Sequence, residues 1–119
     1  MKDSNNFELI IAIVNKGFTD LVMDAAKEKG ARGGTTFNAH GTGNKNLEDF
    51  FGITIQPEKE VVFILVKENI KDDVLLAIYK AVGLETKGNG IAFALKVEDV
   101  VGISQEVKEK VEEIKEENK

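Results

Sequence analysis

The stretch VVFILVKENIKDDVLLAIYKAVG (61–83) decides the fold, because it holds the clearest strand and the clearest helix of the chain. Its first six residues, VVFILV (61–66), form a continuous apolar run, which is the strongest strand signal of the chain. In the part after it, residues 69–83, helical spacing places four apolar residues on one face. These residues are Val74, Leu75, Ile78 and Val82.

The sequence on either side of this stretch predicts the same two kinds of element. FELIIAIV (7–14) is a second apolar run of strand length, TTFNAHG (35–41) predicts a third strand, and IAFALKV (91–97) predicts a fourth. Residues 17–30 predict a helix that ends at Gly30, because glycine readily adopts the left-handed backbone conformation that caps a helix. Its apolar residues recur at helical spacing: Phe18, Leu21, Val22, Ala25 and Ala26.

The predicted order is strand, helix, strand, strand, helix, strand. This order is the split βαβ pattern of the α+β ferredoxin-like fold, a four-stranded antiparallel sheet with two helices on one face. Ile10, Ala12, Val14 and their neighbours keep both sides of the first strand apolar. We therefore expect the open face of the sheet to pack against another subunit in a closed homo-oligomer.

The carboxyl-terminal residues 104–119 predict an additional, charged helix. Val107, Val111 and Ile114 form a narrow apolar stripe among mixed charges. The stripe fits either a helix that binds a partner or a solvated helix that rests on its own oligomer.

Composition bounds the function. The chain has 119 residues, enough for one domain with a hydrophobic core, taken here as residues 1–103. It contains no cysteine and one histidine, which excludes disulfides, thiolate metal sites and a multi-histidine site within one chain. Its net charge of −5 argues against a broad nucleic-acid surface. We see no signal peptide or apolar run long enough to span a membrane, so we expect a cytoplasmic protein.

Two glycine clusters stand out, GARGGTTFNAHGTG (30–43) and KGNG (87–90). Glycines let backbone N–H groups approach a phosphate, but glycine pairs at strand boundaries also simply make turns. Neither cluster has the sequence of a Walker P-loop or the spacing of a Rossmann phosphate loop.

Other residues offer little chemistry. The adjacent carboxylate pairs, Glu48 with Asp49 and Glu98 with Asp99, are interpreted as solvated surface. His40 lies near a glycine cluster but has no partner that the sequence identifies, so a structural or exposed role is favoured over a ligand role.

Taken together, ELIIAIVNKG, GGTTFNAHGTG, PEKEVVFILV and TKGNGIAFALKVEDVVGI resemble the PII signal-transduction family, in its divergent PII-like branch. The resemblance spans residues 8 to about 103 and implies a trimer with nucleotide sites in the clefts between neighbours. It identifies residues 42–58 as the T-loop, the arm that engages target proteins, and residues 84–90 as the B-loop, which wraps phosphates.

The resemblance also implies the site residues. Gly88, Asn89 and Gly90 match the B-loop, Gly41, Thr42 and Gly43 match the segment before the T-loop, and Gly33, Gly34 and Thr35 match positions that approach the adenine and ribose from the adjacent subunit. Replacing Gly90 by aspartate is expected to abolish nucleotide binding and leave the trimer intact.

The chain departs from the family pattern where the phosphates are bound. Asn89 replaces an aspartate, Ile91 replaces a lysine, and Gly102 and Ser104 stand near the usual arginine pair. Because each lost charge-assisted hydrogen bond can remove about 1.5–3 kcal/mol, we expect ADP or AMP in preference to ATP. We assign no metal, since the sequence identifies no carboxylate that would bind one. Lys59 at the base of the T-loop can restore positive charge, as can Lys45 or Lys87.

The expected T-loop is shorter than in the standard family and lacks its uridylylated tyrosine. Lys45 falls near the glutamine that precedes the 2-oxoglutarate position, so nitrogen sensing through 2-oxoglutarate is not supported. Phe50, Phe51 and Ile53 offer an apolar docking surface for a partner, or they tuck against the trimer and order the loop.

The first functional hypothesis is a non-enzymatic regulator that binds an adenine nucleotide and signals to a target through the T-loop. A membrane transporter is suggested as the target only by the resemblance to the family. The second is a trimeric scaffold with a degenerate nucleotide site, and the third is a weak nucleotide hydrolase.

Overall fold

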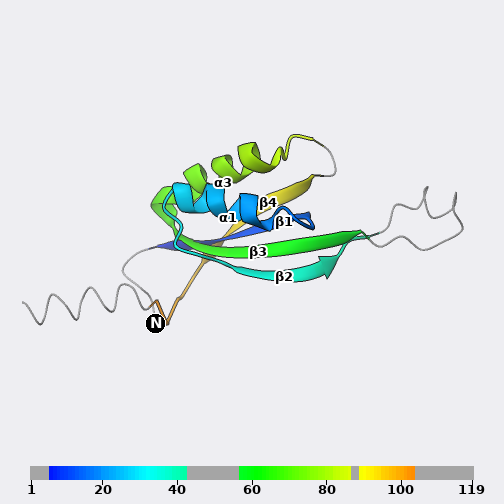
Figure 1. The fold of residues 1–119 in the computed structure, drawn as a ribbon. Coiled ribbons are helices and arrows are strands. Elements are labelled where there is room, and N and C mark those ends of the chain that lie inside the picture. The colour runs from blue at the N-terminus through cyan, green and yellow to red at the C-terminus, as the bar shows by residue number, and fades with distance from the viewer. Residues whose placement is uncertain (1–5, 43–56, 87–88, 104–119) are drawn as a thin grey trace, which may run out of the picture.

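The computed structural model describes residues 6–42, 57–86 and 89–103. The elements follow the predicted order (Figure 1). They are β1 (Phe7–Asn15), α1 (Thr19–Glu28), β2 (Thr35–His40), β3 (Glu58–Lys67), α3 (Glu68–Val82) and β4 (Gly90–Val97). The predicted carboxyl-terminal helix at 104–119 lies outside the described residues.

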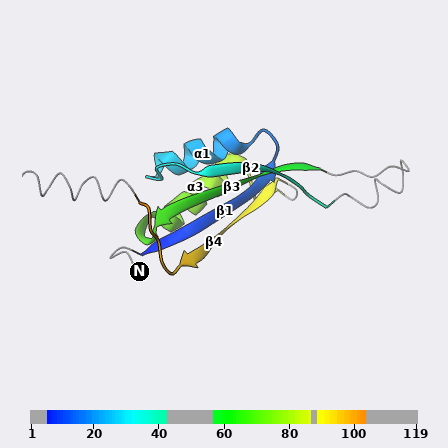
Figure 2. The same cartoon turned by 90° about the horizontal axis from the view of Figure 1, so that it is seen from below.

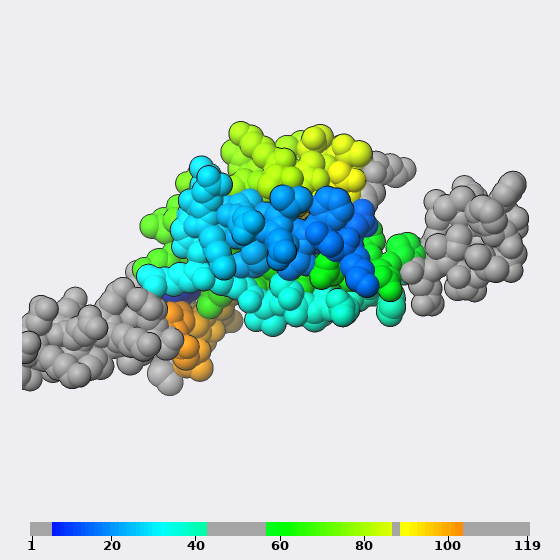
Figure 3. Space-filling view, viewed as in Figure 1, coloured from blue at the N-terminus to red at the C-terminus, as the bar shows by residue number. Residues whose placement is uncertain are grey.

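The four strands form one antiparallel sheet in the order β2-β3-β1-β4. Figure 2 shows this order from the side away from the helices, and Figure 3 shows α1 and α3 packed together as a layer over the strands. One sheet with two helices on one face confirms the predicted ferredoxin-like fold.

The hydrophobic core lies between the sheet and the two helices. Alternate residues of each strand point to the face that the helices cover, and these residues are apolar. The strands contribute Ile10, Ala12, Val14, Val62, Ile64 and Val66, and the helices contribute Val22, Ala26, Val74, Ile78 and Val82. Leu21 was expected in this group, but 46% of it is exposed. On α1, Val22, Ala25 and Ala26 form the buried stripe, and Leu21 lies at its outer edge.

The opposite face of the sheet is apolar and open. Leu9, Ile11 and Ile13 lie along its centre on β1 and are partly buried. The flanking strands add exposed large side chains: Phe37, Phe63, Leu65, Ile91, Phe93 and Leu95. The rings of Phe37 and Phe63 pack edge to face, with centroids 5.2 Å apart. The neighbours of Ile10, Ala12 and Val14 thus supply the apolar open face that the sequence predicts.

The largest difference from the predicted boundaries is at β3, which begins at Glu58 instead of Val61. Its first residues are paired on both sides, because Lys59 lies opposite Asn15 of β1 and Ala39 of β2. Lys59 therefore belongs to the sheet, where its direction is fixed by the strand.

Two glycines follow the ends of the helices. Gly30, two residues after α1, has a φ of +107°, and Gly83 caps α3 in the left-handed region with a φ of +72°. Both have the positive φ that glycine adopts most readily, as expected for Gly30 from its place in the sequence. Among the described residues, no helix is long and apolar enough to cross a membrane.

Candidate functional site

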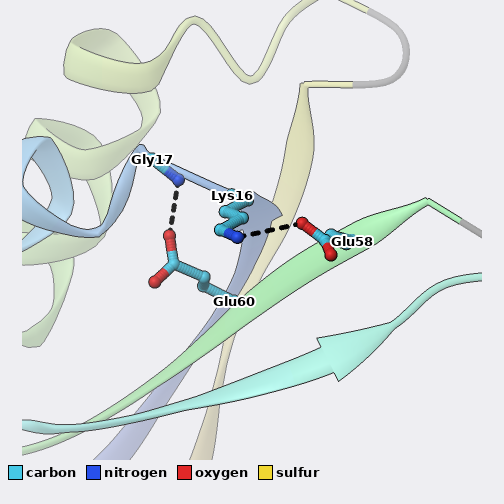
Figure 4. Close-up of polar contacts among 4 residues, drawn as sticks. All are labelled: Lys16, Gly17, Glu58 and Glu60. Atoms are coloured by element: carbon cyan, nitrogen blue, oxygen red, sulfur yellow. Dashed lines mark hydrogen bonds and ion pairs between the residues drawn. The ribbon is translucent and has the colours of Figure 1, made fainter.

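The start of β3 separates opposite charges onto the two faces of the sheet. Glu58 and Glu60 point toward the helix side, where the Glu58 Oε2 atom lies 3.1 Å from the Lys16 Nζ atom (Figure 4). The Gly17 N–H donates to the Glu60 Oε1 atom at 2.5 Å. Both carboxylates are thereby held on the turn between β1 and α1.

Lys59 lies between these carboxylates in the sequence but projects to the open face. Its ammonium donates to the Asn15 Oδ1 atom at 2.5 Å, in a partly buried setting. The ammonium thus contacts a neutral amide, and the flanking glutamates are on the other side of the sheet.

A shallow hollow of about 250 Å³ opens beside Lys59 on this face, lined by Ile13, Lys59, Gly90 and Ile91. Lys59 and Gly90 reach it from opposite sides of β1, because Lys59 pairs with Asn15 and Gly90 pairs with Val14. The fold therefore brings two of the predicted nucleotide-binding residues together within one chain.

The close packing of β4 against β1 requires a glycine at position 90. Its φ is +142°, and a Cβ atom there would lie 2.4 Å from the Ile13 carbonyl oxygen and 3.1 Å from the Val14 Cα atom. The expectation that a Gly90→Asp variant would leave the assembly intact is therefore not a clean test, because any side chain forces β4 away from β1. Lys59 is the better residue to change.

Asn89 closes the turn between α3 and β4. Its side-chain amide donates to the carbonyl oxygens of Val82 at 3.3 Å and Gly83 at 3.1 Å, and its backbone N–H donates to Thr86 at 3.2 Å. An aspartate could not donate these side-chain bonds, since a carboxylate is only an acceptor. The asparagine thus stabilises the carboxyl end of α3, whose last carbonyls need donors.

Gly41 lies at the same end of the sheet as Lys59. Its N–H donates to the Pro57 carbonyl at 2.8 Å, so one hydrogen bond joins the two residues that flank the segment 42–56. A Cβ atom on Gly41 would lie 3.3 Å from the Lys59 Cε atom, which shows how closely the lysine stem passes. Thr42 is exposed beside it.

Gly33, Gly34 and Thr35 lie at the other end of β2. Thr35 pairs with Phe63, four residues along β3 from Lys59, which corresponds to roughly 13 Å at the usual rise of a strand. A Cβ atom on Gly34 would lie 2.8 Å from the Phe63 carbonyl oxygen, whereas a Cβ atom on Gly33 would have no neighbouring atom within 4 Å. Within one chain this group does not meet Lys59 and Gly90, and its contribution from a neighbour stays a prediction.

A larger pocket of about 500 Å³ lies at this far end of the sheet. Gly102 and Ile103 line it together with Phe7, Arg32 and Lys67. The two basic residues were not identified from the sequence as site candidates. Gly102, placed by the resemblance near a phosphate arginine, is therefore remote from Lys59 within one chain.

Asn15 is the other residue that sequence reasoning missed. The available signal was its place at the end of the first strand, but its pairing with Lys59 requires the extended register of β3. Ile91, at a position where the resemblance implies a cation, is 57% exposed and lines the hollow. His40 is exposed opposite Glu58, and the exposed pair Glu98 and Asp99 agrees with a surface role.

Several predicted residues lie outside the described residues. They are Gly43, Gly88, the basic residues Lys45 and Lys87, and the proposed docking residues Phe50, Phe51 and Ile53. Among the residues that are described, no group of three or more histidines, aspartates or glutamates could hold a metal ion.

Comparison with known proteins identifies the family. The model of the family described as nitrogen regulatory protein P-II matches residues 7–107. The chain belongs to the P-II family. No curated protein sequence matches it. Among solved structures, Arabidopsis thaliana PII bound to citrate matches with a TM-score of 0.66 and 24% identity, over 84% of this chain and 85% of that one. At this identity the match supports the P-II fold, in agreement with the strand order.

Proposed function

We propose that this P-II family protein is a regulator without enzymatic activity, which binds an adenine nucleotide at clefts between the subunits of a homotrimer. One observation carries the proposal: Lys59 and Gly90 flank the same hollow, and the two carboxylates beside Lys59 are on the other face. A lysine ammonium with a neutral partner beside a glycine-bounded hollow is suited to a phosphate.

The open sheet face supports the assembly. Its apolar residues on all four strands form a patch of the kind that monomers rarely leave in water. Packing of three copies would bury this face and would bring Gly33, Gly34 and Thr35 of one copy toward the hollow of the next. Such a cleft would combine the two groups of residues that lie apart within one chain.

The nucleotide is proposed to be ADP or AMP. The described part of the hollow contains one lysine, and Ile91, which also lines it, stands at a position where the resemblance implies a cation. Three linked phosphates would carry more charge than this hollow offsets, so ATP is expected to bind more weakly. Binding would then alter the predicted T-loop, 42–58, because Gly41, which directly precedes it, lies beside the Lys59 side chain. A change in this loop would change its contact with a protein target. A membrane transporter is the target class that the family suggests.

Isothermal titration calorimetry tests this proposal on the full chain, with AMP, ADP, ATP and cyclic adenine nucleotides, each with and without Mg²⁺. Citrate serves as a polyanion without a base. Saturable binding of ADP or AMP at one site per chain, tighter than citrate, is the expected result. No heat with any nucleotide would instead favour the trimeric scaffold with a degenerate site, for which Ile91 at the hollow is the supporting observation.

The matched pair Lys59→Gln and Lys16→Gln assigns the binding to the hollow. Both lysines lie at the same end of the sheet, but Lys16 is paired with Glu58 on the helix side. Loss of Lys59 should weaken ADP binding about tenfold or more, while loss of Lys16 should change it by less than about twofold. Equal effects from both variants would reduce the role of Lys59 to general attraction of an anion.

A further inference from the structure

Asn15, the neutral partner of Lys59, lies outside both glycine clusters. It is the last residue of β1 and lies directly opposite Lys59 in the register. Its Oδ1 atom accepts a hydrogen bond of 2.5 Å from the lysine ammonium. Backbone bonds hold this end of β1 in place: the Phe18 N–H donates to the Asn15 carbonyl at 3.2 Å, and the Lys16 N–H donates to the Glu58 carbonyl at 3.3 Å. The amide is therefore carried by a fixed piece of backbone.

The Lys59 side chain is confined along its length. Its stem passes Gly41, where a Cβ atom would lie 3.3 Å from the Cε atom and 3.5 Å from the Cγ atom. Its ammonium then ends on Asn15. Because a free lysine loses considerable rotamer entropy when it binds a ligand, a stem and head that are already held reduce that cost.

The chemistry of Asn15 matters as much as its position. An amide oxygen orients an ammonium without cancelling its charge, and an ammonium has three N–H donors, so two remain after the bond to Asn15. A carboxylate at position 15 would also orient Lys59, but it would form an ion pair and compete with an incoming phosphate. The nearby carboxylates of Glu58 and Glu60 are already held by Lys16 and Gly17 on the other face.

We propose that Asn15 is a positioning residue, which holds the Lys59 ammonium beside the hollow bounded by Gly90 so that it can donate to a phosphate. This inference rests on the proposed function and extends it to a residue outside both glycine clusters. Asn15 acts through Lys59 and is not itself required to touch the ligand.

Calorimetric titration of ADP tests the inference with Asn15→Ala, Asn15→Asp, Lys59→Gln and the double variant Asn15→Ala/Lys59→Gln. Asn15→Asp should weaken binding about tenfold or more, and Asn15→Ala should weaken it by a smaller factor, about threefold to tenfold. In the Lys59→Gln background, Asn15→Ala should have almost no further effect, because the two residues act as one unit. Additive losses, or an Asn15→Asp protein that binds ADP as well as the wild type, would overturn the proposal.

A second measurement separates this inference from the proposed function. The ammonium signal of Lys59 is followed by NMR in ¹⁵N-labelled protein, assigned by its absence from Lys59→Gln, while inorganic pyrophosphate is added. In the wild type, pyrophosphate should shift an ordered Lys59 signal, and in Asn15→Asp this shift should be lost. If no nucleotide binds but the pyrophosphate result holds, the nucleotide assignment fails and the Asn15 assignment stands. If Asn15→Ala leaves the Lys59 signal and its response unchanged, the Asn15 assignment fails whatever ADP does.

Discussion

The two faces of the sheet are built from alternate residues of the same strands, yet they differ in what covers them. On one face, Ile10, Val62 and Ile64 are fully buried under α1 and α3. On the other, Phe63, Leu65 and their neighbours on β4 are similar in apolarity but exposed in the single chain. One face shows a core that the chain completes by itself, and the other shows apolar surface that the proposed trimer would complete.

The largest expected effect comes from a charge on the open face, which should change the number of chains in the particle. Leu95→Asp should reduce the particle from three chains to one, because the carboxylate would be buried without a partner in the proposed interface. Light scattering after size exclusion measures the mass. Leu76→Asp is the matched control, since Leu76 on α3 is 51% exposed and Leu95 is 52% exposed. A wild-type monomer, or dissociation by both variants alike, would contradict the proposed use of the open face.

A pair of adjacent β3 residues compares the faces within one strand. In the monomeric Leu95→Asp background, Ile64→Ala should lower the free energy of unfolding by about 2–5 kcal/mol, because a fully buried side chain leaves a cavity. Leu65→Ala, on the open face and 38% exposed, should cost less than about 1.5 kcal/mol. Urea unfolding provides both values, and equal losses would show that the open face is covered even in one chain.

Asn89 links β4, which contributes to the open face, to the helix layer on the other side. Asn89→Asp should lower the free energy of unfolding by about 1–3 kcal/mol, because two donated hydrogen bonds are lost and a carboxylate faces the two carbonyl oxygens. Asn89→Ala, which loses the bonds without adding the charge, should lie between this variant and the wild type. Thermal unfolding measures the series, and an aspartate variant as stable as the wild type would exclude the capping role.

The smallest expected effect concerns the charges at the start of β3. Glu58→Gln should lower the free energy of unfolding by less than about 1 kcal/mol, because the side chains of Lys16 and Glu58 are 66% and 59% exposed. A double-mutant cycle with Lys16→Gln isolates the pair. A coupling energy well above this range would mean that the ion pair is shielded from solvent, for example by the proposed neighbour.

The fold was predictable because each element carries its own periodic signal. The runs at 7–14 and 61–66 and the helical stripe of Val74, Ile78 and Val82 specify element type and order locally. The exposed Leu21 was not predictable, since only tertiary packing decides which side of a broad apolar stripe is covered.

The candidate site was predictable only in part. The glycines were visible, but the structural demand on Gly90 comes from the Ile13 carbonyl on another strand. The pairing of Lys59 with Asn15 depends on the start of β3, and strand ends in polar sequence carry little periodic signal. The capping role of Asn89 also arises from a contact across the turn, which residue type alone does not specify.

The bridge between the Gly41 N–H and the Pro57 carbonyl has a consequence for how this protein can diversify. Because this hydrogen bond already joins Gly41 to Pro57, replacing the residues between them should disturb the sheet little. The entropy of closing a flexible loop changes by only about 0.6 kcal/mol for each doubling of its length. By this estimate, a change in the length of the segment between Gly41 and Pro57 should cost little free energy of folding, because the sheet already holds both ends.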